Sequence, residues 1–478
     1  MSSSNFSGKK CNIFFLLFLC NNLDVIILII AEGGWSMTDT QIVKELVGLE
    51  PNLNVFNIEE VKLKGKKVKV IEVANGDSRV RCPYCSKYTR NVHDKLKPIK
   101  IKYLDIAGYT TYLKVYKRRF NCLKCGRRFT ENNYINNKGK KLSLKLEQKI
   151  LVDLREYNLS LKYIAKSNNV SDNTVRNVLK EYMKDYKKYL KTVPSVISFD
   201  EFKADTRKGK YAFIINDLLH KKALDILPTR KKDDLLQYFT FTENRSSVQY
   251  VVSDMYEPYL TVTTIMFPKA KYVVDRYHYI TYIMGALDNI RIRLQKEYGE
   301  KSREYKLLKN KKNVSILRKY SNEINWWVEQ ERYKNGKMIR ILPGEIISEL
   351  LEIDDDLKRG YQLKELFLDI VHHTTLEDIE RQLNAFIDLC YESKIEEFIE
   401  AANTINNWLP YIVNSFIDKR FSNGFTEGLN NKIKVIKRIG FGYKNFDFFR
   451  LRLLYILNNK NCKKCESSKN KKSKKSKK

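Results

Sequence analysis

The stretch PSVISFDEFKADTRKGKYAFIINDLLHKKALDILP (194–228) decides the fold. It contains three short runs rich in β-branched and aromatic residues, SVISFDEF (195–202), YAFIIND (211–217) and ALDILP (223–228), with polar turns between them. Runs of this kind are typical of strands, and short polar connections predict that consecutive strands are antiparallel. The sequence therefore predicts a sheet that begins with three consecutive antiparallel strands.

Two more strands are predicted further along the chain. A helical stretch, KKDDLLQYF (231–239), is followed by VQYVVSD (248–254), a helix around EPYLTVTTIMF (257–267) and AKYVVD (270–275). Apolar runs that alternate with helices are typical of buried strands. The order of three strands, helix, strand, helix and strand is that of the ribonuclease H-like fold, a mixed sheet with helices.

Three acidic residues close predicted strands. Asp200 ends the first strand, Asp254 the fourth and Asp275 the fifth. In this fold the ends of the first and fourth strands lie side by side, whereas the fifth lies further out. Cleavage of a phosphodiester by two metal ions requires carboxylates that hold the ions around the scissile phosphate. We therefore predict Asp200 and Asp254 as ligands, with Asp275 as the alternative second acid; otherwise Asp275 caps a helix, and His278 packs or contacts DNA.

A third acid stands in a basic stretch near the C-terminus. NGFTEGLNNKIK (423–434) predicts a helix that carries Glu427, and Lys434, seven residues further on, shares its face. An acid that binds metal and a lysine that binds the neighbouring phosphate belong on one side of such a helix. We expect helices from about residue 424 to 458. The candidate phosphate-binding side chains of the catalytic region are Arg230, Lys434, Lys437 and Arg438.

The segment from about residue 276 to 415 has almost wholly helical periodicity and a more acidic balance than the rest of the chain. It carries no evident strand pattern, so we predict an all-α insertion into the sheet domain. Trp326 and Trp327 lie within it. Two interpretations of these tryptophans stay open: stacking on a splayed base, or packing in a core or interface.

Four cysteines form two C-x-x-C pairs, CPYC (82–85) and CLKC (122–125), which flank alternating stretches such as TTYLKVYKRRF (110–120). Four thiolates are the preferred ligand set of structural zinc, and strands bring distant pairs together in zinc ribbons. The alternative is two unrelated knuckle-like turns, and His93 is expected at the surface. The predicted Zn²⁺ ligands are Cys82, Cys85, Cys122 and Cys125.

Residues 146–186 predict a helix-turn-helix. Apolar residues recur at helical spacing, NNVS (168–171) marks a tight turn, and Ser171 has the position of a helix N-cap. The second helix would enter a major groove, unless the pair is a helical hairpin that serves packing alone. Its candidate DNA-contacting residues are Asn173, Thr174, Arg176 and Asn177.

Composition agrees with a polyanionic partner. The chain has 478 residues, a formal charge of +33, 43% hydrophobic and 12% aromatic residues. A folded protein with so positive a surface is expected to bind nucleic acid. The basic residues are spread along the chain, and no predicted helix pairs an apolar face with a lysine face, so we expect no membrane partner. Nothing indicates a small-molecule substrate.

The two ends of the chain need separate treatment. CNIFFLLFLCNNLDVIILII (11–30) resembles a signal or an anchor, but Asn21, Asn22 and Asp24 divide it into runs too short to span a bilayer. We interpret residues 1–36 as an upstream extension, with a helix and the natural start at Met37, and expect a cytoplasmic, nucleoid-associated bacterial protein. Residues 461–478 are expected to be a basic disordered tail in which two cysteines have no zinc partners.

These motifs together resemble the ISL3 family of bacterial insertion-sequence transposases. The resemblance rests on SFDEFK, VVSDMYEPY, KYVVDRYHY and SNGFTEGLNNKIKVIKRIGFGYKNFDFFRLRLL, behind a zinc ribbon and a helix-turn-helix. It implies a DDE transposase that cuts transposon ends and joins their 3′ hydroxyls to target DNA. Asp200, Asp254 and Glu427 would then bind Mg²⁺ or Mn²⁺, and synapsis of two ends implies a homodimer or a higher oligomer.

Two other functions fit part of the pattern: a DNA-binding regulator without catalysis, and a nuclease of the same fold that cuts but does not join. The first leaves the acids at the strand ends without a role. We expect a multidomain α+β chain. Its predicted segments are an extension (1–36), a zinc-ribbon domain (37–135), a helix-turn-helix (140–190), the first part of a ribonuclease H-like core (194–290), a helical insertion (291–415), the last core helices (416–460) and the tail (461–478).

Overall fold

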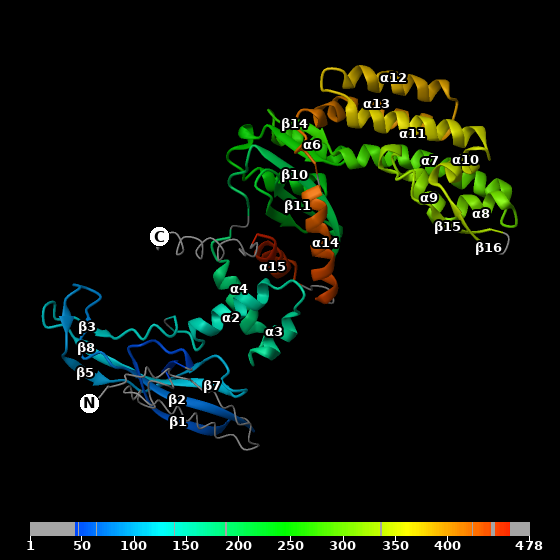
Figure 1. Ribbon diagram of the computed structural model, residues 1–478. Helices are drawn as coiled ribbons and strands as arrows, with labels where there is room; N and C mark the ends of the chain where they lie inside the picture. The colour runs from blue at the N-terminus through cyan, green and yellow to red at the C-terminus, as the bar shows by residue number, and fades with distance from the viewer. Residues whose placement is uncertain are drawn as a thin grey trace, which may run out of the picture. The chain divides into compact units, whose positions relative to one another are not determined.

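The computed structural model describes residues 44, 45, 47–63, 65–137, 139–186, 189–334, 337–422, 424–440 and 445–458. The extension at 1–36, the helix expected from Met37 and the tail at 461–478 lie outside the described residues, apart from two short pieces of that helix. The chain divides into two compact units, Met1–Ser143 and Leu144–Lys478. Figure 1 shows both units, and each is described below by itself.

The first unit contains a four-stranded sheet in the order β1-β2-β7-β6. β2 is antiparallel to β1 and parallel to β7, which is antiparallel to β6. Buried and part-exposed residues alternate along β7, so one face of this strand packs on a core that includes Leu53, Val73 and Leu113. The strands are β1 (Leu53–Leu63), β2 (Lys66–Asn75), β6 (Ile99–Lys102) and β7 (Thr110–Tyr116).

The strands predicted around the cysteines are confirmed. β3 pairs with β4, and β5, β8 and β9 form a three-stranded sheet. The first C-x-x-C pair lies between β3 and β4, and the second between β8 and β9. These strands are β3 (Val80–Arg81), β4 (Tyr88–Thr89), β5 (Val92–Lys95), β8 (Arg118–Asn121) and β9 (Arg128–Thr130).

The second unit begins with three helices, α2 (Leu144–Arg155), α3 (Leu161–Ser167) and α4 (Asp172–Tyr182). The predicted cap is confirmed, because the Ser171 hydroxyl accepts a hydrogen bond from the Thr174 backbone N–H at 3.2 Å. Asn169, with φ of 49°, takes the left-handed conformation in the turn between α3 and α4.

A five-stranded mixed sheet follows, and all five predicted strands are confirmed. Its order is β12-β11-β10-β13-β14, in which β10, β11 and β12 are antiparallel and β13 and β14 run parallel to β10. Helices α5 (Lys232–Phe239) and α6 (Glu257–Met266) lie where the sequence predicts them. The strands are β10 (Val196–Thr206), β11 (Gly209–Asp217), β12 (Lys222–Leu227), β13 (Tyr250–Ser253) and β14 (Lys271–Val274).

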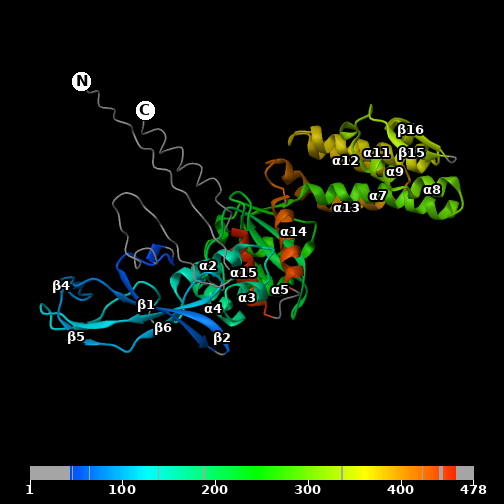
Figure 2. The same cartoon turned by 60° about the horizontal axis from the view of Figure 1, so that its bottom comes forward.

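A group of helices follows β14. Figures 1 and 2 show α7 leaving the sheet and running beside α11 and α13. The core of these helices is continuous with the core on one face of the sheet. The helices are α7 (Arg276–Tyr298), α8 (Arg303–Lys309), α9 (Lys311–Arg318), α10 (Pro343–Leu351), α11 (Asp355–His373), α12 (Ile379–Glu392) and α13 (Glu396–Val413).

The expectation that this segment is wholly helical is wrong. β15 (Gln330–Lys334) and β16 (Lys337–Ile341) form an antiparallel pair within it. The sequence between the strands is Asn335-Gly336, the dipeptide that most favours two-residue hairpins. The helical interpretation of INWWVEQE gave this signal too little weight.

The last two helices, α14 (Gly424–Ile439) and α15 (Phe446–Asn458), return to the sheet. Leu453 and Leu457 of α15 share a core with strand residues of β10, β11 and β12. On its other side α15 meets the first three helices, where the Tyr455 hydroxyl donates to the Leu151 carbonyl at 2.9 Å and the buried Arg452 guanidinium donates to the Leu159 carbonyl. α15 is therefore packed between the sheet and α2–α4.

Within the part of the chain that the structure describes, no helix has the length and apolar character needed to cross a bilayer.

Candidate active site

Asp200 and Asp254 stand side by side on neighbouring strands. Ser198 of β10 pairs with Val252 of the parallel strand β13, and each aspartate follows that pair by two residues. Side chains two residues apart project from the same face of a strand. Asp200 does not end its strand, as the sequence suggested, because β10 continues to Thr206. It stands instead where the pairing of β10 with β13 ends.

Asp275 follows the next strand outward. Ser253 pairs with Val274, so Asp275 continues β14 as Asp254 continues β13. The strand order β10-β13-β14 therefore puts Asp254 between the other two acids. Asp275 is 4% exposed and occupies the N-cap position of α7 without a capping hydrogen bond from its side chain.

The carboxylate of Asp200 is crowded by negative charge. Its Oδ1 accepts a hydrogen bond from the Glu201 backbone N–H at 2.6 Å, and its Oδ2 accepts one from Asn430 Nδ2 at 2.9 Å. Burial and the charge of Asp254 nevertheless raise the pKa of Asp200 to about 7. The site thus holds two close carboxylates whose joint ionisation is unfavourable without a cation.

His278 contacts Asp254. Its Nε2 lies 2.6 Å from Asp254 Oδ1 and 3.9 Å from Asp275 Oδ2. Burial alone would lower the pKa of His278, but the contact with Asp254 and the nearby carboxylates raise it above its usual value. His278 follows Asp275 by three residues in the sequence, but its ring lies closer to Asp254.

Buried polar groups fix the start of α14 on the sheet. Thr426 is fully buried, and its hydroxyl lies 3.2 Å from the Ser198 hydroxyl and accepts a hydrogen bond from Asn216 Nδ2 at 3.1 Å. Glu427, the next residue, is exposed, and Asn430, one turn later, bonds to Asp200. The first turn of α14 is therefore anchored beside the two aspartates.

The lysine and arginine side chains of α14 lie further along the same helix. Lys437 donates from Nζ to the Lys203 carbonyl at 2.8 Å and to Asp205 at 3.2 Å, while Lys434 and Arg438 are exposed. Glu427, Asn430, Lys434 and Lys437 follow one another at helical spacing, which gives them one face of the helix.

Arg230 pairs with Glu201, the residue that follows Asp200 on β10. The Arg230 guanidinium donates to Glu201 and lies over the rings of Tyr211 and Tyr256, at 4.4 and 4.9 Å from their centroids. Glu201 also accepts from the Tyr259 hydroxyl at 2.7 Å. In this structure Arg230 is thus engaged within the protein, and it is 31% exposed.

Asp217 does not belong to this group. It pairs with Ile197 across the sheet, three residues before Asp200, and its carboxylate contacts His220 Nδ1 at 2.8 Å. Asp217 also ends a strand, but β11 is antiparallel to β10, so it ends beside the start of β10 and away from Asp200.

The aspartates fit a divalent cation by their chemistry. Carboxylate oxygens are preferred ligands of Mg²⁺, and burial together with the charge of Asp254 raises the pKa of Asp200, so a cation bound there would favour its ionised form. Asn430 Oδ1 is buried without a hydrogen-bond partner and offers a further oxygen nearby. Glu427 is not gathered with them: among the described residues, the cysteine cluster alone brings together three or more acids, histidines or cysteines at ligand spacing.

The four predicted cysteines form that cluster, with ligand atoms within 4.8 Å of one another. Backbone N–H groups of Cys125 and Lys124 lower the pKa of Cys122 to about 6. The N–H of Lys87 favours the Cys85 thiolate, but burial and the other three thiols outweigh it and raise the pKa of Cys85 to about 11. Four converging thiols with backbone donors form a complete tetrahedral ligand set for structural Zn²⁺.

The predicted DNA-contacting residues lie on α4, but they differ in exposure. Asn173 and Asn177 are exposed, whereas Thr174 and Arg176 are half-buried. The Arg176 guanidinium lies 4.6 Å from the ring centroid of Phe448, so it faces α15. Lys180 is also exposed and follows Asn177 by three residues, a position on the same face that the sequence analysis missed.

Comparisons with known proteins agree with these features. A family model described as a transposase of the ISL3 type matches residues 197–453, and a model for the zinc finger of the IS204, IS1001, IS1096 and IS1165 transposases matches residues 78–125. The transposase for insertion sequence element IS1001 of Bordetella parapertussis is 22% identical over 379 residues, which cover 78% of this chain and 87% of that protein.

A second relative is similar to a smaller part of the chain. A Lactococcus lactis subsp. lactis protein named ATP-dependent protease is 32% identical over 126 residues, which are 26% of this chain and 39% of that protein. The chain thus covers less than two thirds of that protein's length.

The matched regions contain the three candidate acids and the four clustered cysteines, and they describe a transposase with a zinc ribbon. The chain belongs to the ISL3 family of transposases.

Proposed function

We propose that this chain is a DDE transposase that binds the terminal inverted repeats of an insertion sequence, cleaves the DNA at its ends and joins the freed 3′ hydroxyls to target DNA. One observation carries the proposal. Asp200 and Asp254 stand side by side on β10 and β13, and Asn430, one helical turn after Glu427, bonds to Asp200. The order β12-β11-β10-β13-β14 supports a ribonuclease H-like core around these residues.

Asp254 is the better second acid. It follows the strand that pairs with β10, whereas Asp275 follows β14, which pairs with β13. The charge of Asp254 contributes to the raised pKa of Asp200, which is evidence that the two carboxylates interact. His278 then orients Asp254 and is not itself a ligand.

Each residue of the proposed site has its own role in DNA cleavage and joining. Asp200, Asp254 and Glu427 would hold a pair of divalent cations, which supply an activated oxygen nucleophile and stabilise the leaving oxygen. Asn430 orients Asp200, and Lys434 on the same helix face binds a phosphate next to the scissile one. Water attacks phosphorus and the P–O3′ bond breaks; the new 3′ hydroxyl then attacks a target phosphate, and a P–O3′ bond of the target breaks.

DNA recognition belongs to other parts of the chain. Asn173 and Asn177 are exposed on α4, which supports a helix-turn-helix whose second helix reads base edges in the major groove. The zinc ribbon would add contacts to the terminal repeats. Synapsis of two ends implies a homodimer or a larger assembly.

Replacement of the acids tests the proposal. Protein is incubated with Mg²⁺ and a labelled duplex that carries the element's end, and cut and joined products are separated. Asp200→Ala, Asp254→Ala and Glu427→Ala should each abolish cleavage and leave binding intact. Asp217→Ala, at the other edge of the sheet, is the matched control and should cleave. Full cleavage by Glu427→Ala would refute the triad, and cleavage without joining would make the protein a nuclease.

A further inference from the structure

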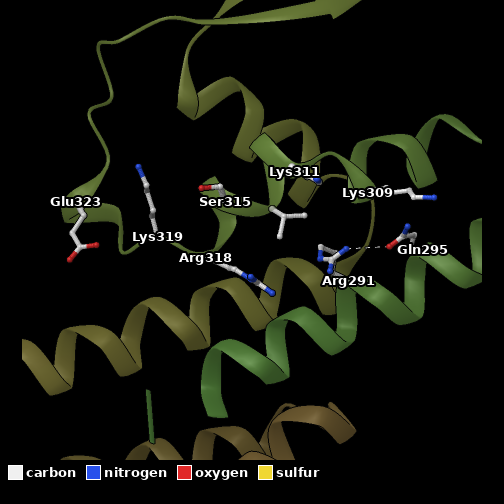
Figure 3. Close-up of a pocket in the computed structure, with 9 residues that line it drawn as sticks. Arg291, Gln295, Lys309, Lys311, Ser315, Arg318, Lys319 and Glu323 are labelled. Carbon is white, nitrogen blue, oxygen red and sulfur yellow. Dashed lines mark hydrogen bonds between the residues drawn. The ribbon is translucent and has the colours of Figure 1, made fainter. Parts of the chain in front are cut away.

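A basic pocket lies in the helical segment, outside the candidate active site. It has a volume of about 800 Å³ and is bounded by residues of α7, α8 and α9, by Lys319 just after α9, and by Glu323 at the end of the 3₁₀ turn Ser321–Glu323. Figure 3 shows Arg291 and Gln295 from α7 on one side of the pocket and Ser315 and Lys319 on the other, with the Arg318 side chain from α9 extending toward Arg291. Of its lining residues, five are lysine or arginine, and Glu323 is the single acid.

A buried arginine forms the floor of the pocket. Arg291 is 9% exposed, and its guanidinium donates to Asp288 at 2.9 Å, to the Leu308 carbonyl at 2.9 Å and to Gln295 at 3.2 Å. Arg318 also pairs with Asp288. Two guanidinium groups thus share one carboxylate, so the floor keeps a net positive charge.

The rim adds lysines. Lys309, Lys311 and Lys319 are exposed, and Lys309 donates to the Tyr305 hydroxyl at 2.8 Å. Among the described residues, neither Lys311 nor Lys319 has a carboxylate partner for its ammonium group. The rim therefore presents ammonium groups that a ligand's anionic oxygens can bind.

The charge is concentrated here and is not a general property of the helical segment. Residues 300–341 contain twelve lysines and arginines against five acids, whereas residues 342–400 contain five against sixteen. A compositional bias of the whole chain would not separate the two signs in this way. The exposed Trp327 and the β15–β16 hairpin lie in the same basic part, and Lys312 Nζ ties the hairpin to α9 through the Glu331 carbonyl at 3.1 Å.

We propose that this pocket binds backbone phosphates of the DNA that is held in the active site. Lys, Arg and Ser donors suit phosphate oxygens. Val314 is the single apolar residue of the lining, so the pocket offers little for the buried anchor side chain that a peptide would need. The inference rests on the proposed function, because it requires a duplex at Asp200 and Asp254.

The length of α7 sets the position of the contact. His278, which touches Asp254, and Arg291 are thirteen residues apart on this helix. At 1.5 Å per residue the pocket lies about 20 Å along the helix from the acids. This corresponds to about six base pairs of duplex at 3.4 Å per step. The pocket would therefore bind the duplex on one side of the scissile bond.

The test is the salt dependence of binding to a duplex with the element's end and 20 flanking base pairs, measured without Mg²⁺. The full chain with Lys311→Glu and Lys319→Glu should show a slope of log affinity against log salt that is smaller by about 2, near 0.9 for each phosphate that the variant no longer neutralises. Lys311→Ala with Lys319→Ala, which is milder, should shift the slope in the same direction. Lys358→Glu with Arg359→Glu on α11 changes the net charge equally and should leave the slope unchanged.

Neutral methylphosphonate linkages locate the bound phosphates. Placed about six base pairs from the cleavage site, they should weaken binding by the unaltered protein and not by the pocket variant. Equal slopes for the pocket and α11 variants would overturn the inference. The inference would also be overturned if the pocket variant kept the salt slope of the unaltered protein but sedimented differently. The pocket would then bind an acidic surface of a second copy of the chain and not DNA. These binding measurements do not involve DNA cleavage. Failure of the catalytic proposal would therefore be detected in a different experiment, the cleavage assay with the alanine variants of Asp200, Asp254 and Glu427.

Discussion

Replacing Asp200 by Asn should stabilise the protein at pH 8 in the absence of Mg²⁺, although it removes a proposed metal ligand. Burial and Asp254 raise the pKa of Asp200 from an ordinary 3.8 to about 7. The folded protein therefore disfavours the ionised carboxyl more than the unfolded chain does. Asn removes the charge and keeps the shape. Its NH₂ group takes the place of Oδ2, so Asn430 must turn its amide before its Oδ1 can accept a hydrogen bond there, and the turn gives up the bond to the Glu201 carbonyl.

The sign and the size of the effect follow from linkage. With the folded pKa above the unfolded one, the cost is absent below about pH 4, grows as the pH rises, and is complete above about pH 7. A difference of about three units at 1.36 kcal/mol each gives an upper value of about 4 kcal/mol. Since Asp200 is partly exposed, we expect a gain of about 2–4 kcal/mol at pH 8 and less than half of it at pH 5.

Urea unfolding followed by tryptophan fluorescence measures this gain, because Trp326, Trp327 and Trp408 all lie in the unit 144–478. Asp205→Asn, an exposed carboxylate on the same strand, is the control and should change stability by less than about 0.5 kcal/mol. Mg²⁺ at ten times its dissociation constant should stabilise the unaltered protein by about 1.4 kcal/mol and the Asp200→Asn protein by less. A destabilised Asp200→Asn protein at pH 8, or an equal gain at pH 5, would refute the reasoning.

Three further predictions concern other parts of the molecule. Thr426→Val should cost about 1–3 kcal/mol in urea unfolding, because it removes the shorter of the two hydrogen bonds that the buried Asn216 amide nitrogen donates; unchanged stability would show that this hydrogen bond does not anchor α14. Cys85→Ala should lower the zinc content measured by atomic absorption and weaken binding to the terminal repeat; full zinc retention would contradict the ligand set. Asn177→Ala should weaken binding to the element's end by about 1–3 kcal/mol in a fluorescence titration with no change in salt slope, and equal weakening on random DNA would rule out base recognition.

The sheet could be predicted because its signals are local. Each strand is a run of β-branched or aromatic residues between polar turns, and the acids Asp200 and Asp254 occur at or near the ends of such runs. The cysteine cluster was predictable for the same reason, since each C-x-x-C pair is complete within four residues.

The supporting contacts of the site could not be predicted in this way, because they join residues far apart in the chain. Asn430 meets Asp200 across 230 positions, and Thr426 meets Ser198 across 228. Nothing in the sequence distinguishes these polar residues of α14 from their exposed neighbours. His278 is 24 positions from Asp254 in the sequence and three from Asp275, whereas the fold brings its ring closer to Asp254.

The position of α15 has a consequence for distances along DNA. This helix is packed between the sheet that carries Asp200 and the helices that include α4, so one folded block holds both. If α4 reads bases as proposed, the protein works as a molecular ruler: the number of base pairs between the recognised sequence and the cut bond is fixed by the protein. Five inserted base pairs, about half a turn of the duplex, would carry the scissile phosphate to the far side of the DNA, where a bound end could not be cut.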